Sequence, residues 1–414
     1  MQHPESLDNS KLSMLSAEVI VAGGGVSGLL IASALAPECS VVLLEQSDYL
    51  PRNKYWLTDE KAICESPHLA GCIDKRYKFL DFVAYDGLRA RICGNYCLWD
   101  TGRLIDQFAQ VLSTNGTRIL TGHRLYSLSH DRNGIVVRAN AESIHARLLI
   151  DCMGFGSPLV GAKNIATVSG YYIMHGCEVG TRGDVPPIAL DNVVIDRQPA
   201  FFELFPTSRG TAHAGIILPS RQYQPGRSLK GELHFILRKS HYSEQISWDP
   251  STNQKSYFGI IPVGRLHEPA LDRIVFFGEA GQANPAASAT GLSRMLRTYR
   301  SLANSLMSCL RQDKLGRKDL LQAIPPYMTR MNRVFQETLF ESLLSFDSDD
   351  FRRLVQDLRE YPDEVINDLV FADFDFAGHR TLPLAVRALF RPDSVLGPHI
   401  LKSILRFFSL KRSM

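Results

Sequence analysis

Residues 17–46 read AEVIVAGGGVSGLLIASALAPECSVVLLEQ, in which a short apolar run, a glycine cluster, a longer apolar run and a third short one follow one another. Spacing and length predict a strand, a turn, a helix and a second strand, which together make a βαβ unit. Glu45 closes the second strand, where an acceptor for ribose hydroxyls is expected. The stretch therefore predicts a dinucleotide-binding lobe.

Each glycine of this turn has an expected role. Gly23 makes the tight turn, Gly25 lets a pyrophosphate approach the backbone, and Gly28 lets the helix pack close to the strand. Val26 and Ser27 begin the helix, whose free N–H groups and dipole attract phosphate. A glycine-rich turn without a ligand is the alternative, and the unit alone does not choose between NAD and FAD.

Composition bounds the remaining possibilities. The chain has 414 residues, 45% hydrophobic and 21% charged, which is typical of a folded enzyme with two or three lobes. A net charge of +3 gives no general field for nucleic acid. Eight cysteines without a CxxC pair indicate neither a disulfide framework nor a metal site and favour the reduced cytoplasm. With no signal peptide in residues 1–16 and no apolar run long enough to cross a bilayer, an integral membrane protein is not expected.

Two later segments repeat the pattern of a strand that runs into small residues. LLIDCMGFGSPLV, residues 148–160, leads into Gly154. RIVFFGEAGQANPAASATGLSRMLRTYRSLANSL, residues 273–306, passes Gly278 and reaches Gly291, which opens an amphipathic helix with Leu292 as the first residue of its buried face. Small residues let backbone N–H groups approach a flat ring and its ribityl chain.

In this order the three segments resemble the FAD-binding motifs of the two-dinucleotide-binding-domain flavoproteins, most closely the lycopene cyclase-like and geranylgeranyl reductase-like group. PRNKYWLTDE at 51–60 and YFGIIPVGR at 257–265 fit the same pattern. The resemblance implies FAD as the cofactor. It also implies an α/β fold in which a Rossmann-like FAD-binding lobe is interleaved with an antiparallel β-sheet substrate lobe and followed by a helical C-terminal region. No second βαβ fingerprint occurs, so NAD(P)H is expected only as a transient reductant.

The expected domains are discontinuous in sequence. Alternating runs, including GIVVRANAESIHARLLI at 134–150, predict strands of the antiparallel substrate sheet. The expected segments are 17–75, 101–164 and 266–312 for FAD binding, 76–100 and 165–265 for the substrate sheet, and 313–414 for the helical region.

The resemblance also implies individual contacts. Arg103, in WDTGRLIDQFAQVL, and Arg52 occupy places from which an arginine approaches the FAD pyrophosphate. Glu279 stands where relatives carry an acid near the ribityl chain. The alternatives are a solvated arginine at a helix start and, for Glu279, an acid that caps a nearby helix.

Two chemistries compete. The first is a redox flavoenzyme that oxidises, hydroxylates or reduces a small apolar metabolite, an isoprenoid or polyene by resemblance. The second is non-redox, lycopene cyclase-type ring closure by substrate protonation over reduced FAD. TAHAGIILPS at 211–220, which matches the acid-bearing strand of lycopene cyclases, has no carboxylate. This favours the redox reading, and the candidate catalytic groups are His213, Glu203 and Glu279, although a strand histidine is more often a core residue. A flavin-dependent binding or regulatory role is a further alternative.

The C-terminal segment, residues 399–414, carries an apolar stripe flanked by Lys and Arg. Such a basic amphipathic helix is typical of contact with an anionic membrane surface, and packing on its own domain is the alternative. The sequence thus predicts a cytoplasmic protein with peripheral membrane association and, for the redox reading, a redox partner.

Overall fold

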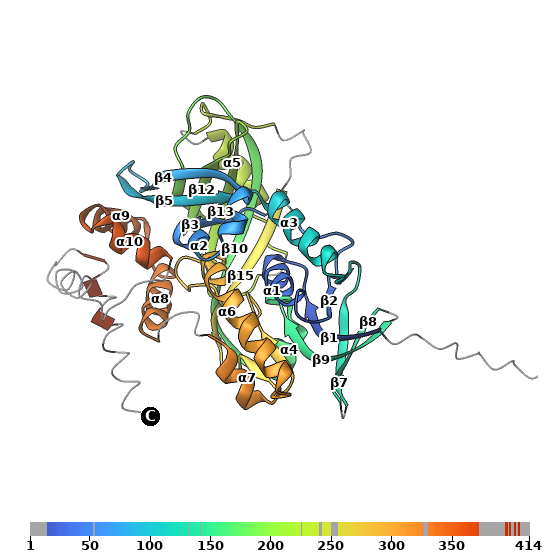
Figure 1. The fold of residues 1–414 in the computed structure, drawn as a ribbon. Coiled ribbons are helices and arrows are strands. Elements are labelled where there is room, and N and C mark those ends of the chain that lie inside the picture. Colours follow the sequence, from blue (N-terminus) through green and yellow to red (C-terminus); the bar gives the residue numbers. More distant parts are fainter. Residues whose placement is uncertain are drawn as a thin grey trace, which may run out of the picture.

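The computed structural model describes residues 15–52, 54–131, 133–140, 142–224, 226–239, 242–249, 256–325, 330–371, 394–395, 397–398, 401–402 and 405. Two sheets and a set of helices make up this part of the chain (Figure 1). The predicted α/β architecture is confirmed, because a Rossmann-like lobe alternates along the chain with a largely antiparallel lobe.

The first sheet is built around the predicted βαβ unit. β1 pairs in parallel with β2, with Val19 opposite Val41, and α1 (Val26–Leu35) connects them. β9 and β17 extend the parallel part on one side and β6 on the other. Its strands are β1 (Leu15–Ala22), β2 (Val41–Leu44), β6 (Arg118–Leu120), β7 (Leu125–His130), β8 (Ile135–Ala139), β9 (Glu142–Asp151), β16 (Ala270–Leu271) and β17 (Ile274–Phe276).

Residues 134–150 belong to the first sheet, which agrees with their place in the expected FAD-binding segment 101–164, whereas the interpretation of their alternation as substrate-sheet strands is wrong. β8 and β9 pair antiparallel with each other, as their alternation suggests, but β9 also pairs in parallel with β1 along most of its length. Its last four residues are continuously buried, which is typical of a strand inside a parallel sheet. Alternation predicts a strand and does not identify the sheet that it joins.

The second sheet is strongly twisted, and in Figure 1 β4 and β5 run across the direction of the long strands β10 and β15. Its neighbours pair antiparallel except β4 and β11, which run in parallel. Its strands are β3 (Leu57–Asp59), β4 (Ile73–Val83), β5 (Arg89–Trp99), β10 (Ala166–Thr181), β11 (Ile188–Ile195), β12 (Gln198–Pro206), β13 (Thr211–Ser220), β14 (Ile246–Ser247) and β15 (Ser256–Leu266).

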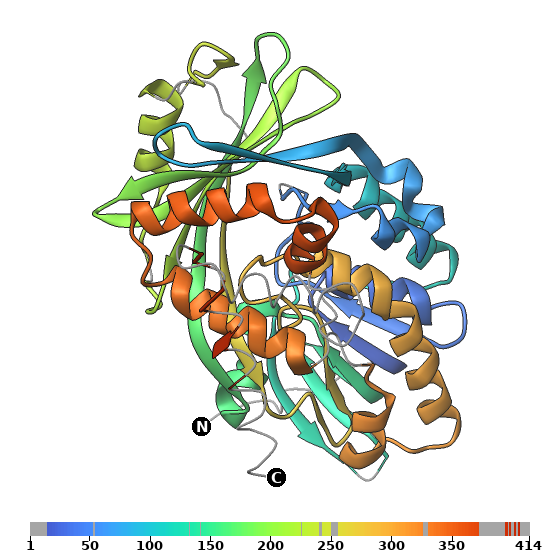
Figure 2. The ribbon, with the colours of Figure 1, turned by 90° about the vertical axis from the view of Figure 1, so that its left-hand side faces the viewer.

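The helices cover both sheets. α6 begins at Gly291, as predicted, and buries its apolar stripe against α1 in the core of the first lobe. In Figure 2 the orange and red C-terminal helices lie across one face of the second sheet, where α9 and α10 contact β5. After α1, the helices of the described chain are α2 (Lys61–Cys64), η1 (Pro67–Cys72), α3 (Thr101–Thr114), η2 (Gly154–Gly156), α4 (Pro158–Lys163), α5 (Lys230–Lys239), α6 (Gly291–Arg311), α7 (Arg317–Ala323), α8 (Arg330–Leu343), α9 (Ser348–Glu360) and α10 (Asp363–Val370).

The helical C-terminal region is confirmed over α7 to α10. Most of the predicted tail at 399–414 lies outside the described residues, apart from Leu401, Lys402 and Leu405. Leu401 and Leu405 are exposed, and Lys402 Nζ lies 3.8 Å from Glu341 Oε2. Among the helices that the structure describes, none combines the length and apolar character needed to cross a bilayer.

Candidate functional site

A cavity of about 880 Å³ lies where the two sheets and the C-terminal helices meet. One end is walled by the glycine turn between β1 and α1 and by the ends of β2 and β9. The other end is walled by apolar side chains of the second sheet and of α8, α9 and α10. A more polar end at the glycine turn, called here the polar compartment, and an apolar end, called the apolar compartment, therefore belong to one continuous cavity.

The glycine turn has the geometry that the sequence predicts. Gly23 has φ +107°, and a Cβ there would lie 2.4 Å from the Cys152 carbonyl oxygen. A Cβ on Gly28 would lie 1.9 Å from the Gly23 carbonyl oxygen, so helix and turn can approach this closely only with glycine. A Cβ on Gly25 would meet no protein atom within 4 Å, although Gly25 lines the cavity. Gly25 therefore leaves open the place where a pyrophosphate would reach the start of α1, beside Val26 and Ser27 in the cavity wall.

Glu45 lies at the cavity beside this turn. Its carboxylate accepts hydrogen bonds from Gly24 N–H at 2.8 Å and from Ser47 N–H at 2.8 Å. These bonds fix the side chain between the two loops, and each oxygen keeps a second lone pair for a ligand hydroxyl. The position fits the expected ribose contact.

The second polar wall comes from the other two glycine segments. Three of their residues line the cavity together with the glycine turn: Gly154, which has φ +71°, Gly291 and Leu292. Gly278 does not line it; a Cβ there would lie 2.5 Å from Ser27 Cβ, so this glycine serves close packing of the loop on α1.

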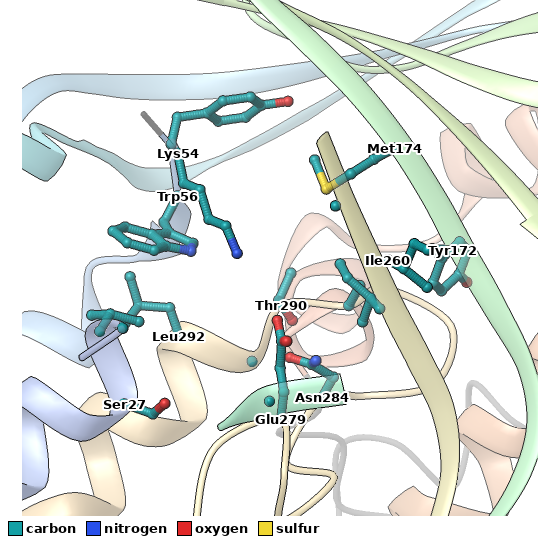
Figure 3. A pocket seen from close by; sticks show the side chains of 18 of the residues that line it. Ser27, Lys54, Trp56, Tyr172, Met174, Ile260, Glu279, Asn284, Thr290 and Leu292 are labelled. Atoms are coloured by element: carbon teal, nitrogen blue, oxygen red, sulfur yellow. The ribbon is translucent and has the colours of Figure 1, made fainter. Parts of the chain in front are cut away.

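Glu279 and Lys54 point into the same open space from opposite walls (Figure 3). Burial raises the pKa of Glu279, and the charge of Lys54 lowers it in part. Thr290, and not Glu279, is the N-cap residue of α6. Lys54 was not assigned a role from the sequence, although it lies within the matched stretch 51–60; a basic residue in that stretch was the available signal.

The two predicted phosphate arginines are not brought to the cavity wall. Arg103 is 57% exposed and lies 3.4 Å from its neighbour Asp100, while Arg52 pairs with Asp106 and is 53% exposed. Arg124 lines the cavity instead, next to His123, whose backbone N–H donates to the Glu45 carbonyl. Sequence reasoning missed Arg124 because the loop after β6 carries no motif.

Glu203 lines the apolar compartment. It lies on β12, and its Oε2 accepts a hydrogen bond of 2.7 Å from the Tyr55 hydroxyl. Burial raises the pKa of Glu203 to about 7, and the bond from Tyr55 lowers it in part. His213 is not at the cavity wall. Its ring stacks on the ring of Tyr55 with 4.9 Å between the ring centroids, and burial lowers the pKa of His213. Of the predicted catalytic groups, Glu203 and Glu279 thus reach the cavity.

Several solved structures are similar to this architecture. Among solved structures, a geranylgeranyl bacteriochlorophyll reductase-like protein from Thermoplasma acidophilum is similar with a TM-score of 0.70 at 15% identity, covering 91% of this chain and 99% of that one. A halogenase solved in complex with FAD is similar with a TM-score of 0.65 at 13% identity, covering 95% and 96%. An anhydrotetracycline hydroxylase from Streptomyces rimosus is similar with a TM-score of 0.62 at 14% identity, covering 89% and 79%.

At these identities the likeness shows a shared fold. No curated protein matches the sequence. The model of the lycopene cyclase protein family matches residues 18–373, which include both sheets and the cavity. The chain therefore belongs to the lycopene cyclase protein family.

Proposed function

We propose that this protein is an FAD-dependent oxidoreductase that acts on an apolar metabolite, of the isoprenoid or polyene class. The observation that carries the proposal is the continuity of the cavity, which joins an open glycine turn to an apolar compartment without an intervening wall. FAD, when bound, supplies the electron transfer, and the protein supplies position and exclusion of water.

The residues present fit FAD. The open face of Gly25 and the start of α1 would receive the pyrophosphate, and Glu45 the ribose hydroxyls. Arg124 and Lys54 would supply positive charge from opposite sides of this end of the cavity. NAD(P)H, or a redox partner, is proposed as a transient electron donor, because the single glycine turn would be taken by FAD.

The apolar compartment would hold the substrate against the second sheet. Its wall includes Met174, Ile260, Phe205 and Leu343, and Met174 and Ile260 face the open space in Figure 3. A ligand that covers this apolar surface excludes water from it, which favours the binding of a hydrophobic molecule.

One observation favours a second candidate function, lycopene cyclase-type ring closure. The carboxylate that strand 211–220 lacks is present on the neighbouring strand as Glu203, in an apolar setting that raises its pKa to about 7. A carboxylic acid held neutral near pH 7 is the group that protonation of an alkene requires.

The experiment that separates the two gives geranylgeraniol or lycopene to the FAD-loaded protein in three states: oxidised, reduced without oxygen, and reduced then exposed to air. In each state the electrons gained or lost by the flavin are counted against product. Flavin reduction matched by oxidised substrate, oxygen-independent flavin reoxidation matched by reduced substrate, or oxygen-dependent flavin reoxidation matched by hydroxylated substrate supports the oxidoreductase. Conversion of lycopene to an isomer with no net electron consumption would instead establish the cyclase, and a protein that neither changes redox state with substrate nor isomerises it would refute both.

A further inference from the structure

A row of residues in register across the second sheet forms a polar site within the apolar compartment. Glu203 on β12 lies opposite Gly215 on β13, Gly215 opposite Gly176 on β10, and Gly176 opposite Tyr257 on β15. Directly paired residues point to the same face of a sheet, so these four positions share one face. Glu203 and Tyr257 line the cavity, which lies on that face.

The two glycines make room for tyrosine rings. A Cβ on Gly176 would lie 2.0 Å from the Tyr257 hydroxyl, and a Cβ on Gly215 would lie 2.9 Å from the Tyr55 hydroxyl. The rings of Tyr55 and Tyr257 meet edge to face at 5.3 Å between centroids. Glycine at both positions thus leaves room for the two tyrosine side chains on this face of the sheet, where the Tyr55 hydroxyl donates to Glu203.

Tyr55 engages one oxygen of the carboxyl. Within the described part of the chain, the Tyr55 hydroxyl donates a hydrogen bond to the Glu203 carboxyl, and the atom that accepts it is Oε2. Oε1 is left for a group inside the cavity. Apolar side chains, among them Leu57, Phe205 and Met174, make up the wall nearby.

We propose that this site, Glu203 held by Tyr55, binds a carbonyl or hydroxyl oxygen of an otherwise apolar substrate. An entirely hydrocarbon ligand would displace water from Oε1 and leave a buried polar group unpaired, which is unfavourable. A ligand oxygen at the same place completes the hydrogen bonding of the Glu203 carboxyl. In its neutral form this carboxyl donates a hydrogen bond to a carbonyl or hydroxyl oxygen. The inference rests on the proposed function only in taking the compartment as the substrate site.

The test compares two probes of nearly equal shape, 2-naphthol and 2-methylnaphthalene, by calorimetric titration of the FAD-saturated protein at pH 6. We expect 2-naphthol to bind about tenfold more tightly, as when a hydrogen bond to a buried carboxyl is made rather than lost. Glu203→Gln should keep most of this preference, because the amide still donates and accepts, and Glu203→Leu should abolish it.

Glu178→Leu is the matched control. Glu178 also lies on this sheet and accepts a bond from Thr211, but it does not line the cavity, so the preference for 2-naphthol should persist. Equal or weaker binding of 2-naphthol, including no binding of either probe, would overturn the inference, as would a preference that survives Glu203→Leu. Failure to take up FAD refutes the proposed function separately, since the probes can also be titrated without it.

Discussion

Gly25 and Gly28 lie three residues apart in one turn, and a side chain added at each should have a different effect. At Gly25 it should weaken FAD binding, and at Gly28 it should lower the stability of the fold. A side chain on Gly25 would enter open cavity, since no protein atom lies within 4 Å of its Cβ position. Gly25 has φ −70° and ψ 178°, an extended conformation that valine adopts readily. Gly25→Val should therefore change the stability of the FAD-free protein by no more than about 0.5 kcal/mol.

The same substitution should strongly weaken FAD binding. The branched side chain would occupy the approach of the pyrophosphate to the N–H groups at the start of α1. Loss of two hydrogen bonds to a charged group, at roughly 1.5 kcal/mol each, weakens affinity by about 100-fold.

Gly28→Ala should behave differently. Its Cβ would lie 1.9 Å from the Gly23 carbonyl oxygen, which is backbone and cannot rotate away. Overpacking of this kind costs about 1–3 kcal/mol, so the FAD-free variant should unfold at lower urea concentration than the wild type.

The assay is urea unfolding of the FAD-free proteins by circular dichroism, together with fluorescence titration of each with FAD. Comparison without FAD is necessary because bound ligand itself stabilises the native state. Near wild-type FAD affinity in Gly25→Val, or an equal loss of stability in both variants, would refute the assignment of this turn.

Three further predictions concern other parts of the molecule. Because burial raises the pKa of Glu203 from 4.5 to about 7, the native state keeps a proton that the unfolded state has lost between these values, and stability should fall with rising pH there. Glu203→Gln should remove about 3 kcal/mol of that fall between pH 4.5 and pH 7, as measured by urea unfolding, and an unchanged slope would contradict the assignment. Arg124→Ala should weaken FAD binding by about tenfold, since Arg124 lines the cavity, whereas Arg103→Ala should leave it unchanged in the same titration. Deletion of residues 399–414 should release the protein from anionic liposomes in a sedimentation assay, and an unaltered distribution would retire the membrane contact.

Local features of the fold could be predicted from the sequence because they depend on neighbouring residues. The glycine turn at 23–28 and the start of α6 at Gly291 follow from spacing within a few residues. The alternation within 134–150 could not identify the sheet that these strands join, since β9 pairs with β1, more than a hundred positions earlier. The resemblance, which made 101–164 an FAD-binding segment, implied the correct lobe.

The residues of the candidate site show the same difference between local motifs and long-range contacts. Gly25 and Glu45 were identified because a motif fixes their spacing. The contact between Tyr55 and Glu203 joins residues 148 positions apart, and no pattern in either segment reports it. Arg103 was chosen by resemblance, yet its helix start is held by Asp100, which accepts from Arg103 N–H at 3.1 Å, and its side chain remains outside the cavity wall.

The central claim is that FAD occupies the cavity at the glycine turn. The most direct measurement is the visible absorbance spectrum of the purified protein after incubation with FAD and removal of the excess. We expect a flavin spectrum corresponding to about one FAD per chain, released on denaturation and absent from Gly25→Val. A colourless protein that takes up no added FAD while remaining folded would contradict it.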